Sequence, residues 1–137
     1  MPSLTTSLYF DGRCQAAFEL YERCLGGKIA FLVKWGDSPL ASEVPPDWHD
    51  KILYARFTLG AGELLGADVP PGEYRAPQGF GVMLEFNDTA EAQRVFDTLA
   101  ANGVARMPLR ETFWAALYGG VVDEFGVPWE INCGRPA

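Results

Sequence analysis

The sequence predicts an α+β fold built from two tandem βαβββ modules, because the same order of elements occurs twice within 137 residues. In each half, a strand-like segment leads into an amphipathic helix, and three further strand-like segments follow. The run Leu8-Tyr9-Phe10-Asp11-Gly12 has its counterpart about 76 residues later in Leu84-Glu85-Phe86-Asn87-Asp88. We therefore expect one domain over residues 1–137, with modules at about 1–68 and 80–137 and a Pro/Gly-rich linker at about 69–79.

The first module begins with a strand at Leu4–Phe10, which is rich in β-branched and aromatic residues. Apolar residues at helical spacing predict a helix over Arg13–Leu25, and Gly26-Gly27 ends it. The next strands are expected at Ile29–Trp35, Ile52–Leu59 and Glu63–Ala67. Gly60-Ala61-Gly62 joins the last two as a hairpin. The stretch Gly36–Asp50, with three prolines, is predicted to be a long loop that serves as a lid or a dimer contact.

The second module repeats this order from a strand at Gly81–Phe86. Asp88 stands three residues before Glu91 and is predicted to cap a helix that ends before Gly103. Strands then follow at Val104–Leu109, Phe113–Val122 and Val127–Cys133, with Glu124-Phe125-Gly126 turning between the last two. Gly119-Gly120 inside a strand indicates a bulge.

Charge and cysteine usage favour an intracellular protein that binds neither nucleic acid nor membrane. The net charge is −7, and the sequence has no stripe of basic residues that could bind phosphate groups. The chain has neither the roughly 20 consecutive apolar residues of a membrane span nor a secretory signal, so we expect a cytoplasmic location. Cys14 and Cys24 are about 15 Å apart along one predicted helix, too far for a disulfide. We expect them and Cys133 to be reduced packing residues.

Alternation along the strands predicts which side chains face a cleft, because successive residues point to opposite faces. In Ile52–Leu59 the odd-numbered residues are all apolar and should face the helix. In Val127–Cys133 the same argument turns the even-numbered residues to the cleft, and the first strand contributes Thr5, Ser7 and Tyr9. For positions 110–118 the alternation does not decide which side chains face the cleft. The candidate cleft residues are Tyr54, Arg56, Met83, Glu111, Trp114, Tyr118, Glu130 and Asn132.

Two βαβββ modules in tandem resemble the vicinal oxygen chelate superfamily, which includes glyoxalases, bleomycin resistance proteins and dioxygenases. The runs Tyr9-Phe10-Asp11-Gly12, Met107–Trp114 and Asp123–Asn132 are similar to its PhnB-like branch. The resemblance implies curved sheets that hold a metal or a substrate on their concave side, and it implies a homodimer. The branch also carries methyltransferase names, but this chain leaves no room for the cofactor domain that a methyltransferase would need.

The resemblance further implies four metal-ligand positions, one on each of four strands, normally occupied by His or Glu. Carried over by strand position, they fall on Thr5, Tyr54, Gly81 and Glu130, of which only Glu130 is a good ligand. Because catalytic metals ordinarily need three or more protein ligands, we predict neither a cofactor nor a bound catalytic metal. The only histidine, His49, is expected to be solvated, or a proton carrier if its loop folds over the cleft.

Two functions remain open at this level, and the sequence does not decide whether the chain is an enzyme. The first is a small-molecule binding protein, with Trp114, Tyr54 and Tyr118 stacking on the ligand and Arg56 and Glu111 fixing its polar groups. The alternative is a metal-dependent lyase, isomerase or dioxygenase. Each candidate also has a purely structural interpretation, in which the aromatic side chains pack the core and Arg56 forms an ion pair with Glu130 or Glu111. We expect an ionised Glu130 paired with Arg56.

Overall fold

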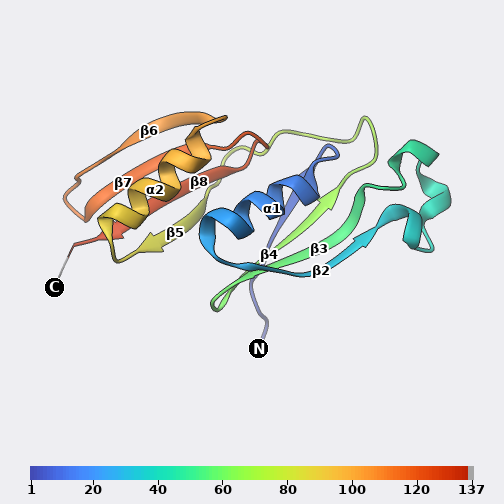
Figure 1. The fold of residues 1–137 in the computed structure, drawn as a ribbon, viewed down its shortest axis with the longest axis horizontal. Coiled ribbons are helices and arrows are strands. Elements are labelled where there is room, and N and C mark those ends of the chain that lie inside the picture. Colours follow the sequence, from blue (N-terminus) through green and yellow to red (C-terminus); the bar gives the residue numbers. More distant parts are fainter. Residues whose placement is uncertain (136–137) are drawn as a thin grey trace. The chain divides into compact units, whose positions relative to one another are not determined.

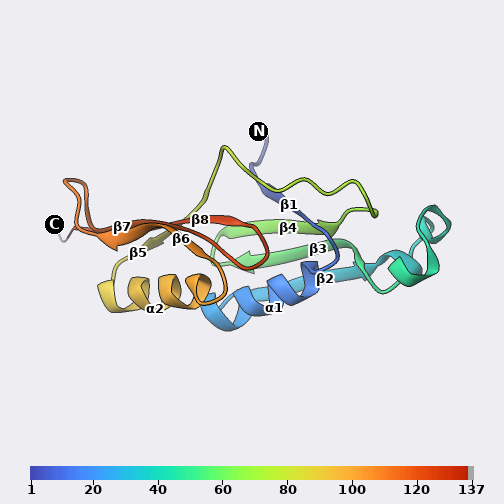
Figure 2. The same cartoon turned by 90° about the horizontal axis from the view of Figure 1, so that it is seen from above.

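The computed structural model describes residues 1–135 and confirms an α+β fold of two βαβββ modules (Figure 1). The chain divides into two compact units, with the boundary between Arg75 and Ala76, inside the predicted linker. Each unit has one four-stranded sheet with one helix against one of its faces (Figure 2). Among the described residues, no helix has both the length and the apolar character that a membrane crossing requires.

The first unit contains one helix, three short 3₁₀ turns and four strands. In chain order these are β1 (Thr6–Phe10), α1 (Cys14–Leu25), β2 (Lys28–Lys34), η1 (Trp35–Asp37), η2 (Ala41–Glu43), η3 (Pro46–Trp48), β3 (Ile52–Leu59) and β4 (Gly62–Asp68). The strands lie in the order β1-β4-β3-β2. β1 is parallel to β4, and the other neighbours are antiparallel. The hairpin between β3 and β4 is confirmed.

Aromatic packing holds α1 against its sheet. The Phe18 ring lies about 6 Å, centroid to centroid, from the rings of Phe10, Tyr21 and Phe57, and all four are fully buried. Gly66 on β4 makes this approach possible, since a Cβ there would come within 2.5 Å of the Phe18 ring. The helix ends at Gly26, whose φ of +81° suits glycine.

The second unit repeats the arrangement without the 3₁₀ turns. Its elements are β5 (Val82–Phe86), α2 (Thr89–Ala100), β6 (Val104–Arg110), β7 (Ala115–Val122) and β8 (Pro128–Gly134), with strand order β5-β8-β7-β6. The Asp88 side chain accepts hydrogen bonds from the backbone of Ala90 and Glu91, as the capping prediction requires. The buried face of α2 is the predicted apolar set Ala92, Val95, Phe96 and Leu99.

Several predicted strand ends differ from the observed ones, and three of them have a clear structural cause. Leu4 is fully exposed, because β1 finds its partner β4 only from Thr6 onward. Trp35 belongs to η1, where its indole donates to the Asp68 carbonyl at 2.9 Å. Phe113 is 90% exposed ahead of β7, since the Thr112 hydroxyl accepts the backbone N–H of Ala115 and closes a turn before the strand begins.

The loop between β2 and β3 is folded on itself. The Gly36 N–H donates to the His49 carbonyl at 3.0 Å, and a His49 ring nitrogen lies 2.9 Å from the Ala41 carbonyl oxygen. His49 is therefore half-buried and tied into the loop rather than freely solvated. The role of this loop as a lid or a dimer contact stays a prediction.

The cysteines are packing residues, as predicted. Cys14, Cys24 and Cys133 are all buried, and none is in a disulfide. Burial, reinforced by the nearby Asp68 carboxylate, raises the pKa of the Cys14 thiol well above its usual range. The thiol is therefore protonated and unreactive in the folded protein.

Candidate functional site

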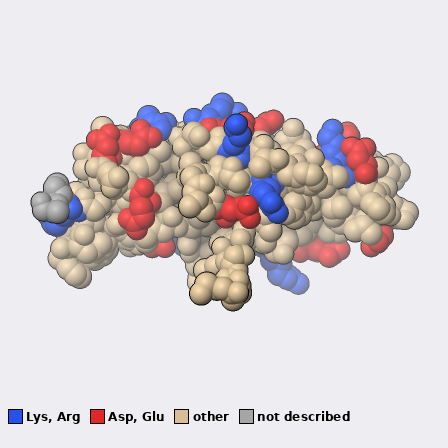
Figure 3. Space-filling model, turned by 90° about the horizontal axis from the view of Figure 1, so that it is seen from below, with Lys and Arg blue, Asp and Glu red and all other residues tan. Residues whose placement is uncertain are grey.

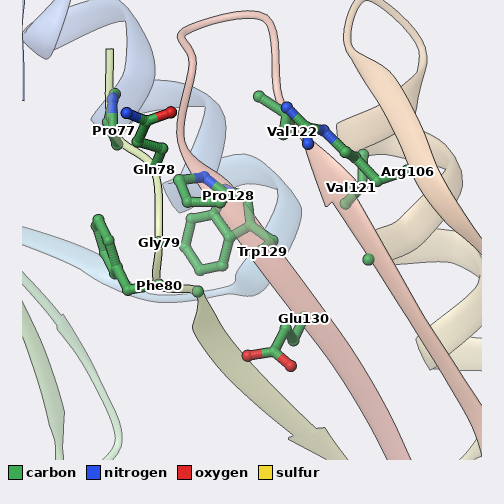
Figure 4. Close-up of a pocket in the computed structure, with 12 residues that line it drawn as sticks. Pro77, Gln78, Gly79, Phe80, Arg106, Val121, Val122, Pro128, Trp129 and Glu130 are labelled. Atoms are coloured by element: carbon green, nitrogen blue, oxygen red, sulfur yellow. The ribbon is translucent and has the colours of Figure 1, made fainter. Parts of the chain in front are cut away.

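The second unit carries a pocket of about 370 Å³ on the face of its sheet opposite α2 (Figure 4). That volume lies within the range of small-molecule sites. The segment 77–81, which leads into β5, forms one wall, and strands β6 to β8 form the others. The lining residues are Pro77, Gln78, Gly79, Phe80, Gly81, Arg106, Gly120, Val121, Val122, Pro128, Trp129 and Glu130.

Strand alternation places Glu130 on this open face. In β8 the residues Trp129, Ile131 and Cys133 are at most 2% exposed and pack toward α2. Glu130 and Asn132 alternate with them and are half-buried on the other face, as the sequence predicted.

A tyrosine fixes the carboxylate of Glu130. The Tyr118 hydroxyl on β7 donates to Glu130 Oε1 at 2.5 Å, a short hydrogen bond of the charge-assisted kind. This bond, together with partial burial, raises the pKa of Tyr118. The phenol therefore keeps its proton at neutral pH and acts as a permanent donor to Glu130. Among residues 1–135, no side chain or backbone group is hydrogen-bonded to the other oxygen, Oε2, so a ligand can use it.

Gly81 gives this carboxylate its space. A Cβ at position 81 would lie only 2.8 Å from Glu130 Oε2 and 3.2 Å from its carboxyl carbon. Any side chain at this position would displace the carboxylate from its present place. Glycine thus keeps Oε2 open to the pocket.

A second hydrogen-bonded group lies further along the same face. The Trp114 indole donates to Asn132 Oδ1 at 3.1 Å, and the Asn132 amide donates to Glu85 at 2.9 Å. The Trp114 ring also meets the Tyr118 ring edge to face at 5.2 Å. Met83, 46% exposed, pairs with Glu130 in the β5–β8 ladder. The structure therefore brings together the predicted residues Met83, Trp114, Tyr118, Glu130 and Asn132.

The remaining predicted residues have other partners. Glu111 lies between β6 and β7 and forms an exposed ion pair with Arg135 at 3.1 Å. In the first unit, Arg56 donates to the Tyr54 hydroxyl at 2.9 Å and pairs with Glu63 at 3.5 Å. The hydrogen bond to Tyr54, followed by the Glu63 charge, raises the pKa of Arg56. Each candidate for the predicted Arg56–Glu130 ion pair thus has a partner within its own unit.

The assignment of Tyr54 to a metal-ligand position was wrong. Glu130 lies on β8, which pairs with β5, and its cross-strand partner is Met83. The corresponding strand of the first unit is β4 rather than β3, and there Leu65 faces Ser7 in the same parallel register. Leucine offers no ligand atom.

The donor set does not fit a superfamily metal. Gly81 is adjacent to Glu130 but has no side chain, and Thr5 lies outside the first strand. Within residues 1–135, His, Cys, Asp and Glu side chains form no cluster of three suited to a metal ion. One carboxylate falls short of the three or more ligands that such a site needs.

Arg106 is the pocket residue that the sequence reasoning missed. Ala105 and Met107 pair with the consecutive residues Val121 and Gly120, so Arg106 between them is the extra residue of a bulge. The predicted irregularity at Gly119-Gly120 is thus real, but the extra residues are on the partner strand β6. A Cβ at Gly119 would lie 2.7 Å from the Met107 carbonyl oxygen, which explains why position 119 is a glycine. This glycine was the sequence feature that could have indicated the irregular pairing of β6.

A buried aspartate was also missed, and it anchors the start of β8. The Asp123 carboxylate is 3% exposed and accepts hydrogen bonds from the backbone N–H groups of Phe125 and Val127. Its second oxygen accepts the Trp129 indole N–H at 2.9 Å. The buried Asp123 carboxylate therefore fixes the turn that sets the register of Pro128 and Glu130.

Comparisons with known proteins agree with this architecture. A family model described as Glyoxalase/Bleomycin resistance protein/Dioxygenase superfamily matches residues 4–131. Protein YjdN of Escherichia coli (strain K12) is 33% identical over 139 residues, which cover 94% of this chain and 93% of that protein.

Two solved structures share the fold over nearly their whole length. Protein PA1353 from Pseudomonas aeruginosa has a TM-score of 0.89 and 39% identity, covering 99% of this chain and 100% of that chain. The PhnB protein from Bacillus cereus has a TM-score of 0.82 over 97% of this chain and 100% of its own. Because its identity is 21%, that likeness concerns the fold alone.

Proposed function

The chain belongs to the glyoxalase/bleomycin resistance protein/dioxygenase superfamily, and we propose that it binds a small molecule in the pocket of its second unit. The observation that carries this proposal is Glu130, a carboxylate held by Tyr118 with one oxygen open at the pocket wall. A pre-positioned polar group beside apolar walls is what small-molecule sites commonly have. Phe80, Val122 and Pro128 supply the apolar walls.

The distribution of charged residues and the net charge support binding of a small molecule rather than of a polyanion. On the face shown in Figure 3, Lys and Arg form separate small groups among Asp and Glu. The chain as a whole carries a net charge of −7. Neither feature suits nucleic acid, whose binding relies on clustered cations.

Glu130→Gln tests the proposal, because it keeps the shape of the side chain and removes the charge. We expect the wild-type protein to give a mass shift for a co-purified molecule in native mass spectrometry, or a rise in Tm with members of a metabolite library. The variant should lose that ligand while Glu43→Gln, an exposed change in the first unit, keeps it.

Metal analysis of the same proteins separates the proposal from the metal-dependent alternative. Stoichiometric zinc, nickel, manganese or iron in wild-type protein that disappears in Glu130→Gln would make Glu130 a true ligand. That result would replace the binding function with a lyase, isomerase or dioxygenase.

We also propose that the chain forms a homodimer. Large apolar side chains are exposed on strands of both units, including Tyr9 and Phe31 at 55% and 52% and Met83 at 46%. Exposed apolar residues of this kind favour association. Light scattering at micromolar concentration should give twice the chain mass, and a monomeric mass would contradict this.

A further inference from the structure

Arg106 owes its place in the pocket to the bulge in β6. In a regular strand, Arg106 would point to the face opposite that of Met107, whose neighbours across the sheet are Gly120 and then Glu130. As the extra residue of a bulge it escapes this alternation, and its side chain lines the same pocket as Glu130. Bulges commonly redirect a side chain in this way beside functional sites.

The guanidinium of Arg106 is unpaired within the part of the chain that the structure describes. Among residues 1–135 it makes neither an ion pair nor a hydrogen bond, although the chain carries an excess of acidic residues. Arg56 in the first unit, by contrast, has both kinds of partner. A cation without a partner at a pocket wall is available to an anionic ligand group.

The two charges occupy opposite ends of the pocket. Figure 4 shows the Arg106 guanidinium near Val122 and the Glu130 carboxylate at the far end, with Pro128 between them. Arg106 and Glu130 lie on β6 and β8, two strand spacings apart, which corresponds to about 10 Å between their backbones. The apolar Phe80 and Pro128 side chains line the same pocket.

We propose that the ligand of this pocket is a dipolar small molecule with an oxyanion group at one end and an ammonium or other strong donor at the other. The oxyanion binds the Arg106 guanidinium, the donor binds Glu130 Oε2, and an apolar body spans Phe80 and Pro128. This inference rests on the proposed binding function and names the chemical class of its ligand. Tyr118 occupies the other oxygen of Glu130 and thereby directs the donor to Oε2.

Three para-substituted benzene probes with the same body test the inference by titration calorimetry. They are para-aminomethylphenylacetate, which carries both charges, para-methylphenylacetate, which carries only the anion, and para-methylbenzylamine, which carries only the cation. We expect the dipolar probe to bind about tenfold tighter than either single-charge probe, because it alone makes both charge-assisted contacts.

Variants assign each end of the probe. Arg106→Gln should weaken binding of the dipolar probe about tenfold and leave binding of the amine probe unchanged. Glu130→Gln should also weaken the dipolar probe about tenfold, but it should leave binding of the acid probe unchanged. Arg106→Lys should restore part of the affinity, which a role of Arg106 in folding alone would not explain. Arg23→Gln, an exposed change on α1, is the matched control and should bind all probes like wild type.

Three results would overturn the inference, and the third would also overturn the proposed function. If Glu130→Gln weakens amine or ligand binding but Arg106→Gln changes nothing, the dipolar class is wrong and the binding function stands. If none of the three probes binds at millimolar concentration, the dipolar class is also wrong. If probes bind with no dependence on Glu130, the proposed function fails as well.

Discussion

Replacing Asp123 with asparagine tests whether the buried carboxylate supports the strand that carries Glu130. In the wild-type protein one carboxylate oxygen accepts two backbone N–H groups, and the other accepts the Trp129 indole N–H at 2.9 Å. Asparagine can keep its carbonyl oxygen toward the backbone donors. Its NH₂ group then faces the indole N–H, so two donors meet and the Trp129 hydrogen bond is lost.

The magnitude follows from the burial of this bond. Asp123 and Trp129 are 3% and 2% exposed, so water cannot replace the lost acceptor. A buried hydrogen bond to a charged group contributes roughly 1.5–3 kcal/mol, so we expect a loss of about 2 kcal/mol in the free energy of unfolding. With an unfolding entropy of about 2.1 cal/mol/K per residue, this lowers Tm by roughly 7 °C.

Urea unfolding followed by far-UV circular dichroism measures this loss. Asp11→Asn is the matched control, since Asp11 is exposed and its replacement should change stability by less than about 0.5 kcal/mol. A double-mutant cycle with Trp129→Phe should give a coupling energy of about 1.5–2 kcal/mol for the carboxylate–indole bond. A wild-type urea midpoint in Asp123→Asn, or a coupling energy near zero, would refute the reasoning.

Three further outcomes are expected from the structure. Gly81→Ala should leave Tm within about 2 °C of wild type, because only the end of the flexible Glu130 side chain must move, yet it should weaken ligand binding in a thermal-shift assay. Tyr118 has a raised pKa, so the unfolded chain loses this proton before the folded protein does. The contribution of Tyr118 to stability is therefore complete below about pH 10 and declines as the pH rises further. Ultraviolet titration at alkaline pH should show Tyr118 ionising late, and Glu130→Gln should reduce this delay. Cys14 should resist a thiol reagent such as DTNB until urea unfolds the protein, and rapid labelling of native protein would contradict its burial.

Local periodicity explains what the sequence could predict. The alternation of Trp129, Ile131 and Cys133 with Glu130 and Asn132 depends only on the pleat of one strand, so the open face of β8 could be read directly. The capping of α2 by Asp88 is equally local. Such features need no knowledge of the neighbouring strands.

Features that depend on strand pairing could not be predicted in the same way. Tyr54 was assigned to a ligand position from the predicted order of strands, but the position is defined by which strand lies beside β5 in the sheet. In the first unit that place belongs to β4 and Leu65. The long loop between β2 and β3 has no counterpart in the second unit, so a constant sequence offset fails beyond it.

Arg106 and Asp123 were missed for a related reason. A strand with regular alternation would have turned Arg106 away from the pocket, and only the pairing of β6 with β7 reveals the extra residue. Asp123 follows an apolar strand and precedes a turn, a place where a solvated aspartate is also common. Its burial depends on Trp129, whose indole reaches it from the next strand.

The two units show how one backbone arrangement can carry a carboxylate at one strand position in one copy and an apolar residue there in the other. Ser7 faces Leu65 in the first sheet where Met83 faces Glu130 in the second, and Tyr9 faces Ala67 where Glu85 faces Asn132. The polar residues of β8 are thus replaced by apolar ones on β4, although the strands occupy the same place. Burying part of a carboxylate on a sheet face is costly unless a donor lies beside it. The second unit provides that donor in Tyr118, which is why we place the proposed ligand pocket in the second unit.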